Sequence, residues 1–552
     1  MSRVLVTGAT GTVGRHVVEL LREAGAEVTT LSRSTGDLTD PGSLPLDEVD
    51  AVYLVWPFAT AEGAREMVEA VASRARRMVY LSSAALRDHE REVERLIEGS
   101  GAEWTFLRPH AFAANALRWA RHVRAGTVRG AYGSAAAPVV HERDIAAVAV
   151  RALLDDGHHG AAYELTGPES IAQAAQVRII SEVTGIPARW EEVPLERARA
   201  DLLAKGWPPG VVDEVLRAQA AEPAPVTSTV EEVTKAPART FREWAAEHAG
   251  DFRTVPGAPP TMRAARIRRF GDASEIRQEE TPPPRPGPGE VLIEVAATAF
   301  NPSEVGLRSG LLPEVFQASL PHTLGWDVSG TVVETGAGVG SLAPGDRVYG
   351  LVSGAAAEYA VAPADLLARA PESIPLADAA AVPVAGLTAW QAVFDHARIT
   401  KGQRVLINGA GGGVGVFAVQ FAKLAGAHVT ATASPRSAAA VKQHGADEVI
   451  DYTAVPLPGD MDVLLNLIPV PGDAARELAG LARMIVTIAT PIEGGTHFVM
   501  RNEPEQLARM AALIDAGNLA VEIAESHPLS ELAEIHRRAE SGDIRGKITI
   551  YL

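Results

Sequence analysis

Two glycine-rich stretches decide the fold of this chain: Gly8-Ala9-Thr10-Gly11-Thr12-Val13-Gly14 and Gly409-Ala410-Gly411-Gly412-Gly413-Val414-Gly415. Each follows an apolar run, at residues 4–6 and 405–407, and each opens a segment with helical periodicity. Glycines in a strand-to-helix turn let the backbone approach a pyrophosphate, whose charge then lies at the helix N-terminus. The sequence therefore predicts two dinucleotide sites, with every residue of the two turns except Ala9 as a cofactor contact. The alternative at either turn is a glycine-rich connection that holds no ligand.

Strand and helix patterns alternate around both turns. In the first half, strand patterns at 3–6, 27–31, 51–55, 78–81 and 104–107 predict a parallel, doubly wound sheet. Residues 251–261 are rich in Pro and Gly without periodicity, which is typical of a linker. Short β-rich runs then predict a small antiparallel or barrel-like domain, and the alternation of strands and helices resumes near residue 388.

Composition excludes several classes of function. The chain has 552 residues, 47% of them hydrophobic, which is enough for several buried cores. Its formal net charge of −18 argues against nucleic acid and anionic membranes as partners. There is no cysteine, hence no disulfide, thiolate zinc site or catalytic thiol. We see no secretory signal and no apolar run as long as a membrane span, so we expect a cytoplasmic protein.

The residues after the second strand of each dinucleotide fold predict the preferred cofactor. An acidic residue there binds the ribose 2′-hydroxyl of NAD, whereas an arginine accommodates the 2′-phosphate of NADP. The first half has Ser32 and Arg33 at this place, and the second has Ser434 and Arg436. We therefore expect NADPH in both halves. The alternative is that both arginines are ordinary solvated side chains.

Several motifs of the first half occur together in order: Val4-Leu5-Val6-Thr7-Gly8-Ala9-Thr10-Gly11, Leu81-Ser82-Ser83, Leu107-Arg108-Pro109 with Asn115, Arg143-Asp144-Ile145-Ala146 and Leu165-Thr166-Gly167-Pro168. With them, residues 1–250 resemble the atypical, NmrA-like branch of the short-chain dehydrogenase/reductase superfamily. Standard members use a Tyr-x-x-x-Lys pair, but this chain has no lysine before Lys205. Ser82 is then the best catalytic candidate, because a strand end points into the cofactor crevice, although a serine there also caps helices. His89 is a weaker proton donor candidate.

The second half carries a longer series of motifs: Phe300-Asn301-Pro302-Ser303, Gly325-Trp326-Asp327-Val328-Ser329-Gly330, Pro344-Gly345-Asp346-Arg347-Val348, Gly386-Leu387-Thr388-Ala389-Trp390, the second glycine turn, Gly445-Ala446-Asp447-Glu448-Val449-Ile450-Asp451-Tyr452 and Gly546-Lys547. From residue 262 onward, the chain resembles the zinc-free NADPH:quinone oxidoreductase branch of the medium-chain dehydrogenase/reductase superfamily. The resemblance implies an α/β chain with two Rossmann-type doubly wound parallel sheets, the second with a GroES-like β-barrel substrate domain. That domain would comprise 262–387 and 513–552, and the cofactor domain 388–512.

The same resemblance implies roles for single residues. Asn301 and Thr388 should contact the nicotinamide end of the cofactor, and Arg436 and Tyr452 its 2′-phosphate and adenine end. Asn301 would otherwise be a turn residue before Pro302, and Tyr452 a packed aromatic at a strand end. Tyr349 is a candidate proton donor, with Tyr359 as a substitute.

Zinc-using relatives carry a cysteine near Asn301 and a histidine at Trp326, so we expect no metal site here. Without a Lewis acid, hydride transfer to an electron-poor acceptor such as a quinone or an enone is favoured. We also expect a homodimer formed through the second half.

Two alternatives stay open. In the first, the two halves are an enoyl reductase and ketoreductase pair that acts on a secondary-metabolite intermediate. In the second, the first half binds NADPH as a sensor or scaffold and catalyses no reaction.

Overall fold

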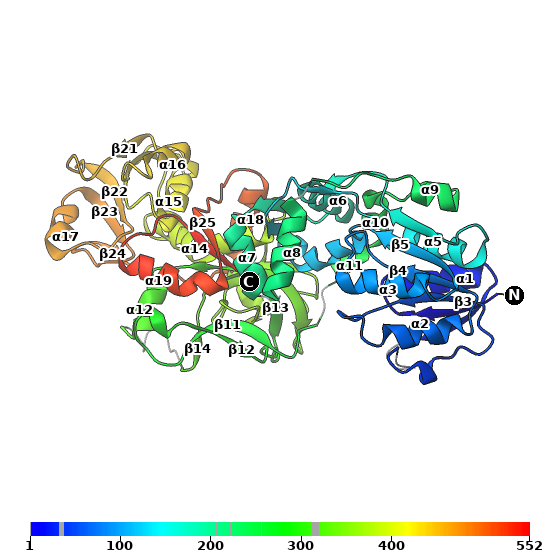
Figure 1. Cartoon of the computed structure of the whole chain (residues 1–552). Helices are drawn as coiled ribbons and strands as arrows, with labels where there is room; N and C mark the ends of the chain where they lie inside the picture. The colour runs from blue at the N-terminus through cyan, green and yellow to red at the C-terminus, as the bar shows by residue number, and fades with distance from the viewer. Residues whose placement is uncertain (1, 32–37, 205–207, 221, 255–256, 312–318) are drawn as a thin grey trace. The chain divides into compact units, whose positions relative to one another are not determined.

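The computed structural model describes residues 2–31, 38–204, 208–220, 222–254, 257–311 and 319–552 (Figure 1). The chain forms two compact units. Unit 1 comprises Met1–Val123 and Val128–Phe252, and unit 2 comprises Arg124–Thr127 and Arg253–Leu552. Each is described by itself.

Unit 1 is built on a six-stranded parallel sheet with the order β2-β1-β3-β4-β5-β8. Its strands are β1 (Arg3–Thr7), β2 (Glu27–Leu31), β3 (Ala51–Val55), β4 (Arg77–Leu81), β5 (Glu103–Pro109) and β8 (Ala161–Leu165). One apolar core holds α1 (Gly14–Glu23) and α5 (Glu142–Leu154) against the sheet, and a second holds α2 (Ala64–Ala72) and α3 (Asp88–Glu98). Helices thus cover both faces, which confirms the doubly wound sheet predicted from the alternating pattern.

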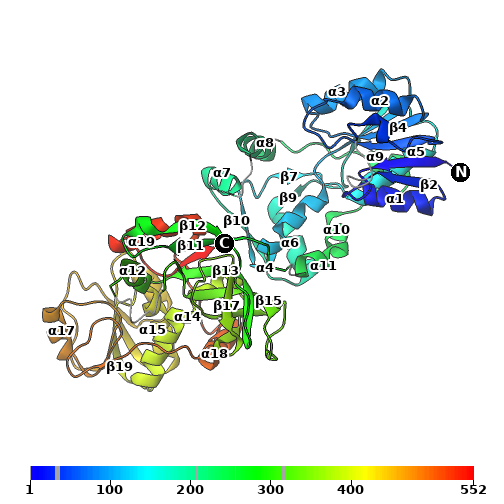
Figure 2. The ribbon, with the colours of Figure 1, turned by 90° about the horizontal axis from the view of Figure 1, so that it is seen from below.

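The remainder of unit 1 is mostly helical. Its elements are η1 (Pro41–Ser43), η2 (Ala113–Trp119), α4 (Ala120–Arg124), β6 (Thr127–Gly130), β7 (Ala136–Ala137), β9 (Ile171–Ala172), α6 (Gln173–Thr184), β10 (Arg189–Glu192), α7 (Leu195–Ala204), α8 (Pro209–Ala220), α9 (Thr229–Thr234), α10 (Phe241–Glu247) and α11 (Ala249–Arg253). Helix α10 packs against α6 (Figure 2), and Trp244 of α10 is completely buried. Helix α11 extends into the predicted linker 251–261, because Phe252 is fully buried and holds its last turn in the core.

Unit 2 begins with a three-stranded and a seven-stranded sheet, which are antiparallel apart from one parallel pair formed by the last two strands of the chain. Their strands are β11 (Met262–Ile267), β12 (Arg277–Thr281), β13 (Glu290–Phe300), β14 (His322–Thr323), β15 (Asp327–Thr335), β16 (Arg347–Leu351), β17 (Tyr359–Pro363), β18 (Leu367–Arg369), β25 (Glu525–Pro528) and β26 (Ile548–Tyr551). The central strand β13 pairs with β15, with β17 over its first half and with β26 over its second half. Among the described residues, β18 and β25 are the two ends of this seven-stranded sheet.

The second parallel sheet has the order β21-β20-β19-β22-β23-β24. Its elements are β19 (Arg404–Asn408), α15 (Gly413–Leu424), β20 (His428–Thr432), α16 (Ala438–Gln443), β21 (Glu448–Ile450), β22 (Met461–Asn466), α17 (Gly472–Ala479), β23 (Ala482–Thr487) and β24 (Thr496–His497). The other helices of unit 2 are α12 (Ser303–Ser309), α14 (Pro383–Trp390), α18 (Pro504–Asp515) and α19 (Leu532–Glu540), with a π-helical turn at Gln391–His396 and short 3₁₀ turns η3 (Ala273–Glu275), η4 (Ala364–Leu366), η5 (Leu376–Ala381) and η7 (Leu529–Glu531).

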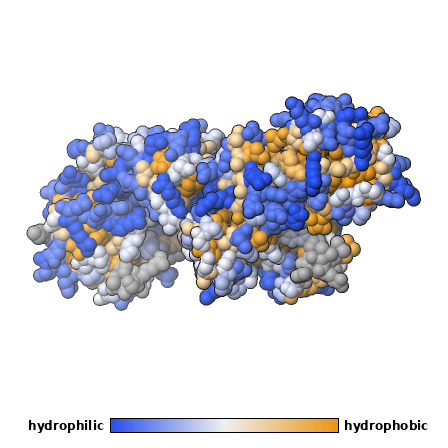
Figure 3. Space-filling view, turned by 180° about the vertical axis from the view of Figure 1, so that it is seen from behind, coloured by the Kyte–Doolittle hydropathy of each residue, from blue (hydrophilic) through white to orange (hydrophobic). Residues whose placement is uncertain are grey.

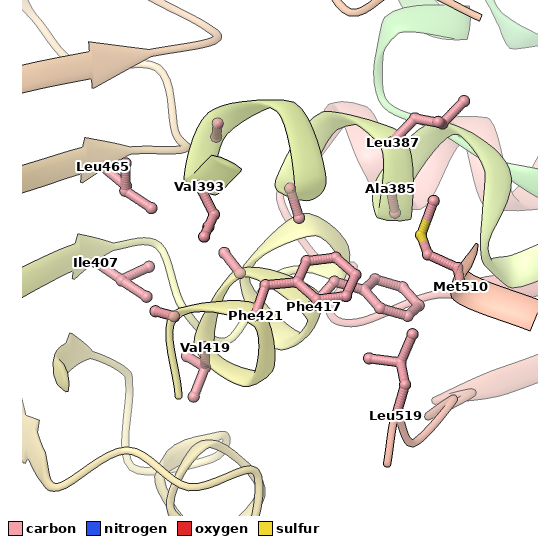
Figure 4. Packing of buried hydrophobic residues seen from close by; sticks show 14 of the residues in the cluster. Ala385, Leu387, Val393, Ile407, Phe417, Val419, Phe421, Leu465, Met510 and Leu519 are labelled. Carbon is pink, nitrogen blue, oxygen red and sulfur yellow. The ribbon is translucent and has the colours of Figure 1, made fainter. Parts of the chain in front are cut away.

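One apolar core joins the two parts of unit 2. Phe417 and Phe421 of α15 lie in the same buried cluster as Ala385 of α14 and Met510 of α18 (Figure 4). This packing fixes α14, which begins beside the antiparallel sheet, against the helix that follows the second glycine turn.

On the face in Figure 3, hydrophilic residues cover much of the surface and apolar residues reach it in patches. In the described part of the chain, no helix is both long and apolar enough to cross a membrane.

Candidate cofactor and reductase sites

The first glycine turn has the geometry that a pyrophosphate site requires. Gly8 has a positive φ of 62°, and its carbonyl oxygen accepts a hydrogen bond of 2.9 Å from Gly11 N. An added Cβ at Gly14 would lie 2.1 Å from that oxygen, so only glycine fits where α1 begins. Thr10, Gly11 and Thr12 are exposed at the tip of the turn. Ser32 and Arg33, predicted to bind the 2′-phosphate, lie outside the described residues.

The carboxyl edge of the first sheet holds an unsatisfied serine. Ser82 follows β4 and is 6% exposed, and within the described residues its Oγ has no hydrogen-bond partner. It does not cap α3, whose N-cap is Arg87, and the neighbouring Ser83 Oγ donates to Glu90 Oε2 at 2.8 Å in the first turn of that helix. Ser82 therefore lies at the crevice with its hydroxyl available.

A histidine that the sequence did not single out follows the neighbouring strand. His110 comes directly after β5, which pairs in parallel with β4. In the described part of the chain its buried Nε2 makes no hydrogen bond, and Glu164 Oε2 lies 3.9 Å away. Because the carboxyl ends of parallel strands meet at one edge, His110 and Ser82 share that edge. The signal for it was its position directly after the Leu107-Arg108-Pro109 motif.

The second glycine turn repeats the geometry of the first. Gly409 has a φ of 91°, and its N–H donates to Thr432 Oγ1 at 2.9 Å. An added Cβ at Gly415 would lie 2.4 Å from Gly409 O, whereas one at Gly412 would lie at an ordinary 3.4 Å from the same oxygen. The inner side of the turn is therefore closed to side chains and the side at Gly412 is open, which suits a bound pyrophosphate at the N-terminus of α15.

Charged and aromatic side chains gather at the carboxyl ends of β20 and β21. Arg436 is exposed beyond β20, and Ser434 Oγ lies 3.3 Å from Ser437 Oγ. Tyr452 follows β21 and is 55% exposed, so it is not a packed strand-end aromatic. Arg545 reaches the same place and donates to Arg436 O at 3.1 Å. Sequence reasoning missed Arg545, which precedes the Gly546-Lys547 motif.

Four buried side chains form what we call the polar cluster: Asn301, Glu304, Asp327 and Lys547, none more than 5% exposed. Asn301 Nδ2 donates to Asp327 Oδ2 at 2.8 Å and to Ala299 O at 3.2 Å. Lys547 Nζ donates to Asn301 Oδ1 at 3.0 Å and to Asp327 Oδ2 at 3.2 Å. Asn301 is thus a fully bonded group in a charged network and more than a turn residue before Pro302.

Backbone N–H groups hold the two carboxylates of the polar cluster. Glu304 accepts from Asn301 N and from Gly325 N, each at 3.1 Å. Burial, with a smaller contribution from Asp327, raises the pKa of Glu304 to about 7 despite these bonds. Asp327 Oδ1 accepts from Val384 N at 2.7 Å, at the N-terminus of α14. Thr388, one turn further along α14, donates to Val384 O at 2.6 Å, so its hydroxyl is bonded to its own helix.

The two candidate tyrosines lie away from the polar cluster. Tyr349 is completely buried, and its hydroxyl donates to Leu507 O at 2.6 Å. Burial raises the pKa of Tyr349 far above its ordinary value. Tyr359 packs in a separate apolar cluster with Met262 and Leu292. To donate a proton to a substrate, the Tyr349 hydroxyl would first have to break its hydrogen bond to Leu507 O, which makes it a poor general acid. We therefore leave Tyr349 out of the proposed site.

The donor set at the polar cluster does not suit zinc. Within the described ranges, no three His, Cys, Asp or Glu side chains are placed so that they could hold a metal ion together. Lys547 instead places an ammonium group against Asn301 and Asp327.

Comparisons with family models match three parts of the chain. Residues 4–110 match the NAD dependent epimerase/dehydratase family, residues 287–372 the alcohol dehydrogenase GroES-like domain, and residues 444–550 a family described as zinc-binding dehydrogenase.

Two curated relatives match about half of the chain each. A (4-alkanoyl-5-oxo-2,5-dihydrofuran-3-yl)methyl phosphate reductase from Streptomyces griseus is 41% identical over 45% of this chain and 99% of its own length. The chloroplastic quinone-oxidoreductase QR1 of Triphysaria versicolor is 31% identical over 52% of this chain and 98% of its own. Among solved structures, the quinone oxidoreductase from Coxiella burnetii is 31% identical, covers 53% of this chain and 99% of its own, and has a TM-score of 0.49.

Proposed function

Because this chain belongs to the NAD(P)H-dependent oxidoreductases, joining an NmrA-like short-chain dehydrogenase/reductase domain to a medium-chain dehydrogenase/reductase of the quinone oxidoreductase family, we propose that its second half transfers hydride from NADPH to a quinone or an enone without zinc. The observation that carries this proposal is the polar cluster around Asn301, which lies in the same unit as a complete glycine turn. NADPH, when bound, supplies the hydride from its nicotinamide. The chain's own residues position the cofactor and exclude water.

The residues around Gly409–Gly415 fit a dinucleotide. The N-terminus of α15 would bind the pyrophosphate, and Asn301 and Thr388 would lie toward the nicotinamide end. Arg436, and with it Arg545, would bind the 2′-phosphate, while the exposed ring of Tyr452 would lie beside the adenine. Two guanidinium groups at the end of β20 support NADPH over NADH, since a charged hydrogen bond contributes about 1.5–3 kcal/mol, or roughly 10- to 100-fold.

Independence from zinc is proposed from the chemistry of the residues. The positions where zinc-using relatives have cysteine and histidine hold Asn301 and Trp326, and the chain has no cysteine. A quinone or an enone is already electron-poor, so its reduction requires orientation more than a Lewis acid.

A pair of glycine variants tests which half carries the reaction. Gly412→Asp places a negative charge where the pyrophosphate should bind, and its Cβ has room. Gly11→Asp does the same in the first half, where the added Cβ would lie 3.1 Å from Gly8 O. We expect Gly412→Asp to abolish quinone-dependent NADPH oxidation and Gly11→Asp to leave most of it. Gly412→Ala is the matched control, because it adds the Cβ without the charge.

The reverse result, with both variants folded, would make the first half the main enzyme. Equal losses in both variants would indicate that the halves depend on each other, and would also contradict our proposal.

A second candidate function is reduction by the first half as well. Two groups at one sheet edge, Ser82 Oγ and His110 Nε2, make no hydrogen bond within the described residues and could donate one to a carbonyl oxygen. The Streptomyces griseus relative is named for a 5-oxo-2,5-dihydrofuran, which is a conjugated unsaturated lactone. In the full chain carrying Gly412→Asp, residual reduction of quinones or unsaturated lactones that Ser82→Ala lowers would support this function. No residual turnover, with NADPH still bound, would favour the sensor or scaffold alternative.

A further inference from the structure

We infer that Lys547 is a positioning residue for hydride transfer in the second half, which fixes the Asn301 amide, balances the charge of Asp327 and links both to the second glycine turn. This inference rests on the proposed function and adds a residue to it. None of the roles predicted from the sequence involved Lys547, which entered only as part of a motif.

The hydrogen bonds of Lys547 decide how the Asn301 amide is oriented. Asn301 Oδ1 faces the ammonium at 3.0 Å, and Nδ2 faces Asp327 Oδ2 at 2.8 Å. Turning the amide over would place its NH₂ against the ammonium and its oxygen against the carboxylate, so both bonds would become repulsive. Without the ammonium, only the bond from Asn301 Nδ2 to Asp327 would still favour this orientation of the amide. Lys547 therefore holds the Asn301 amide in one of its two possible orientations.

Charge balance gives Lys547 a second task. Lys547 is 4% exposed and Asp327 is fully buried, and their charged atoms lie 3.2 Å apart. Glu304 is the other carboxyl group of the polar cluster. A charge that stays buried after its partner is removed is strongly unfavourable, so Asp327 requires Lys547 more than a surface carboxylate requires its lysine.

The stem of Lys547 lies against the glycine turn. An added Cβ at Gly413 would be 2.8 Å from Lys547 Cδ, so the first residue of α15 is in contact with the lysine. The preceding Gly546 forms a parallel bridge with Gly412. One residue thus touches the proposed pyrophosphate turn through its carbon chain and Asn301 through its ammonium. A shift of the glycine turn would therefore move the side chain of Lys547 and, through its ammonium, Asn301.

The test compares two lysine variants of the full chain. Lys547→Met removes the ammonium but keeps a stem of similar length against Gly413. The matched control is Lys423→Met. Lys423 lies in the last turn of α15, outside the polar cluster, and also forms an ion pair, with Asp447 at 2.7 Å. We expect Lys547→Met to lower kcat with a quinone by about 10- to 100-fold, a range typical of lost positioning. Its Kd for NADPH, measured by fluorescence in the Gly11→Asp background so that only the second half binds, should change by less than about threefold.

Two further readouts separate positioning from a merely structural role. With NADPH deuterated at the transferred position of C4, the kinetic isotope effect on kcat should rise in Lys547→Met, because hydride transfer becomes slower than product release. The double variant Lys547→Met/Asp327→Asn should recover part of the lost kcat, since the unbalanced charge is gone. A structural role predicts instead that kcat and NADPH affinity fall together with the melting temperature, without recovery.

The inference is overturned if Lys547→Met behaves like Lys423→Met, or if its loss of kcat shows neither a larger isotope effect nor recovery in the double variant. Failure of the proposed function has a different signature, namely quinone-dependent turnover that survives Gly412→Asp.

Discussion

Glu304→Gln should make the stability of unit 2 much less dependent on pH. Glu304 is 1% exposed and accepts backbone hydrogen bonds from Asn301 and Gly325. Burial raises its pKa from 4.5 to about 7. A carboxyl group whose pKa is raised by folding binds more protons in the native state, so it contributes stability that is fully present below about pH 4.5 and lost as the pH rises through about 7.

The size of the effect follows from that shift. Proton linkage with pKa values of 4.5 and about 7 gives a loss of roughly 2 to 3 kcal/mol in the free energy of unfolding between pH 5 and pH 8. The Gln side chain does not titrate and keeps one acceptor oxygen. The difference in free energy of unfolding between the wild type and Glu304→Gln should therefore be larger at pH 5 than at pH 8, by roughly 2 to 3 kcal/mol.

Scanning calorimetry of the full chain at both pH values measures this difference, because it resolves transitions of separate units. Glu275→Gln is the control. Arg269, which donates to Glu275 at 2.8 and 2.7 Å, lowers the pKa of Glu275, so the contribution of this carboxylate is lost only as the pH falls below about 4.5. Between pH 5 and pH 8 the gap between the wild type and this control should stay constant. A gap for Glu304→Gln that is also constant would refute the assignment of a raised pKa.

Four further outcomes are expected. Arg436→Ala and Arg545→Ala should each reduce the preference for NADPH over NADH in kcat/KM by about tenfold, and an unchanged ratio in both would remove the 2′-phosphate role. Gly415→Ala, whose Cβ would lie 2.4 Å from Gly409 O, should weaken NADPH binding to the second half by at least about tenfold in titrations, with tight binding as the contrary result. Chelators should leave turnover unchanged, and stoichiometric zinc in active protein would contradict the proposed chemistry. The homodimer stays a prediction. If it forms through the exposed residues after β24, Val499→Asp should yield a monomer in light scattering, because Val499 is 79% exposed. An unchanged mass would exclude that surface.

The elements and the glycine turns could be predicted because their signals are local. Strand patterns predicted β1 to β5 of the first parallel sheet to within a few residues but missed β8, and the turns lie where strand and helix patterns meet. The end of unit 1 was harder. A stretch rich in Pro and Gly hides the fact that Phe252 is buried and extends α11.

The candidate site was predicted only in part, because its contacts join distant segments. Asn301 and Thr388 were recognised from motifs, but the network that holds Asn301 depends on Lys547, 246 positions along the chain. Tyr349 shows the converse. Alternation along β16 indicates that its side chain is on one face, but not that this face meets Leu507 O instead of a cleft.

The order of the polar cluster along the chain has a consequence for refolding. Asn301 and Asp327 precede the second parallel sheet, and Lys547 follows it, at separations of 246 and 220 positions. Contacts of such long range close loops that contain a whole folded sheet, so they form late. The glycine turn, by contrast, is made within a few residues. A refolding chain that carries Gly11→Asp, and so binds NADPH only in its second half, should therefore regain NADPH binding before it regains turnover. The interval between the two recoveries measures how late Lys547 joins the polar cluster.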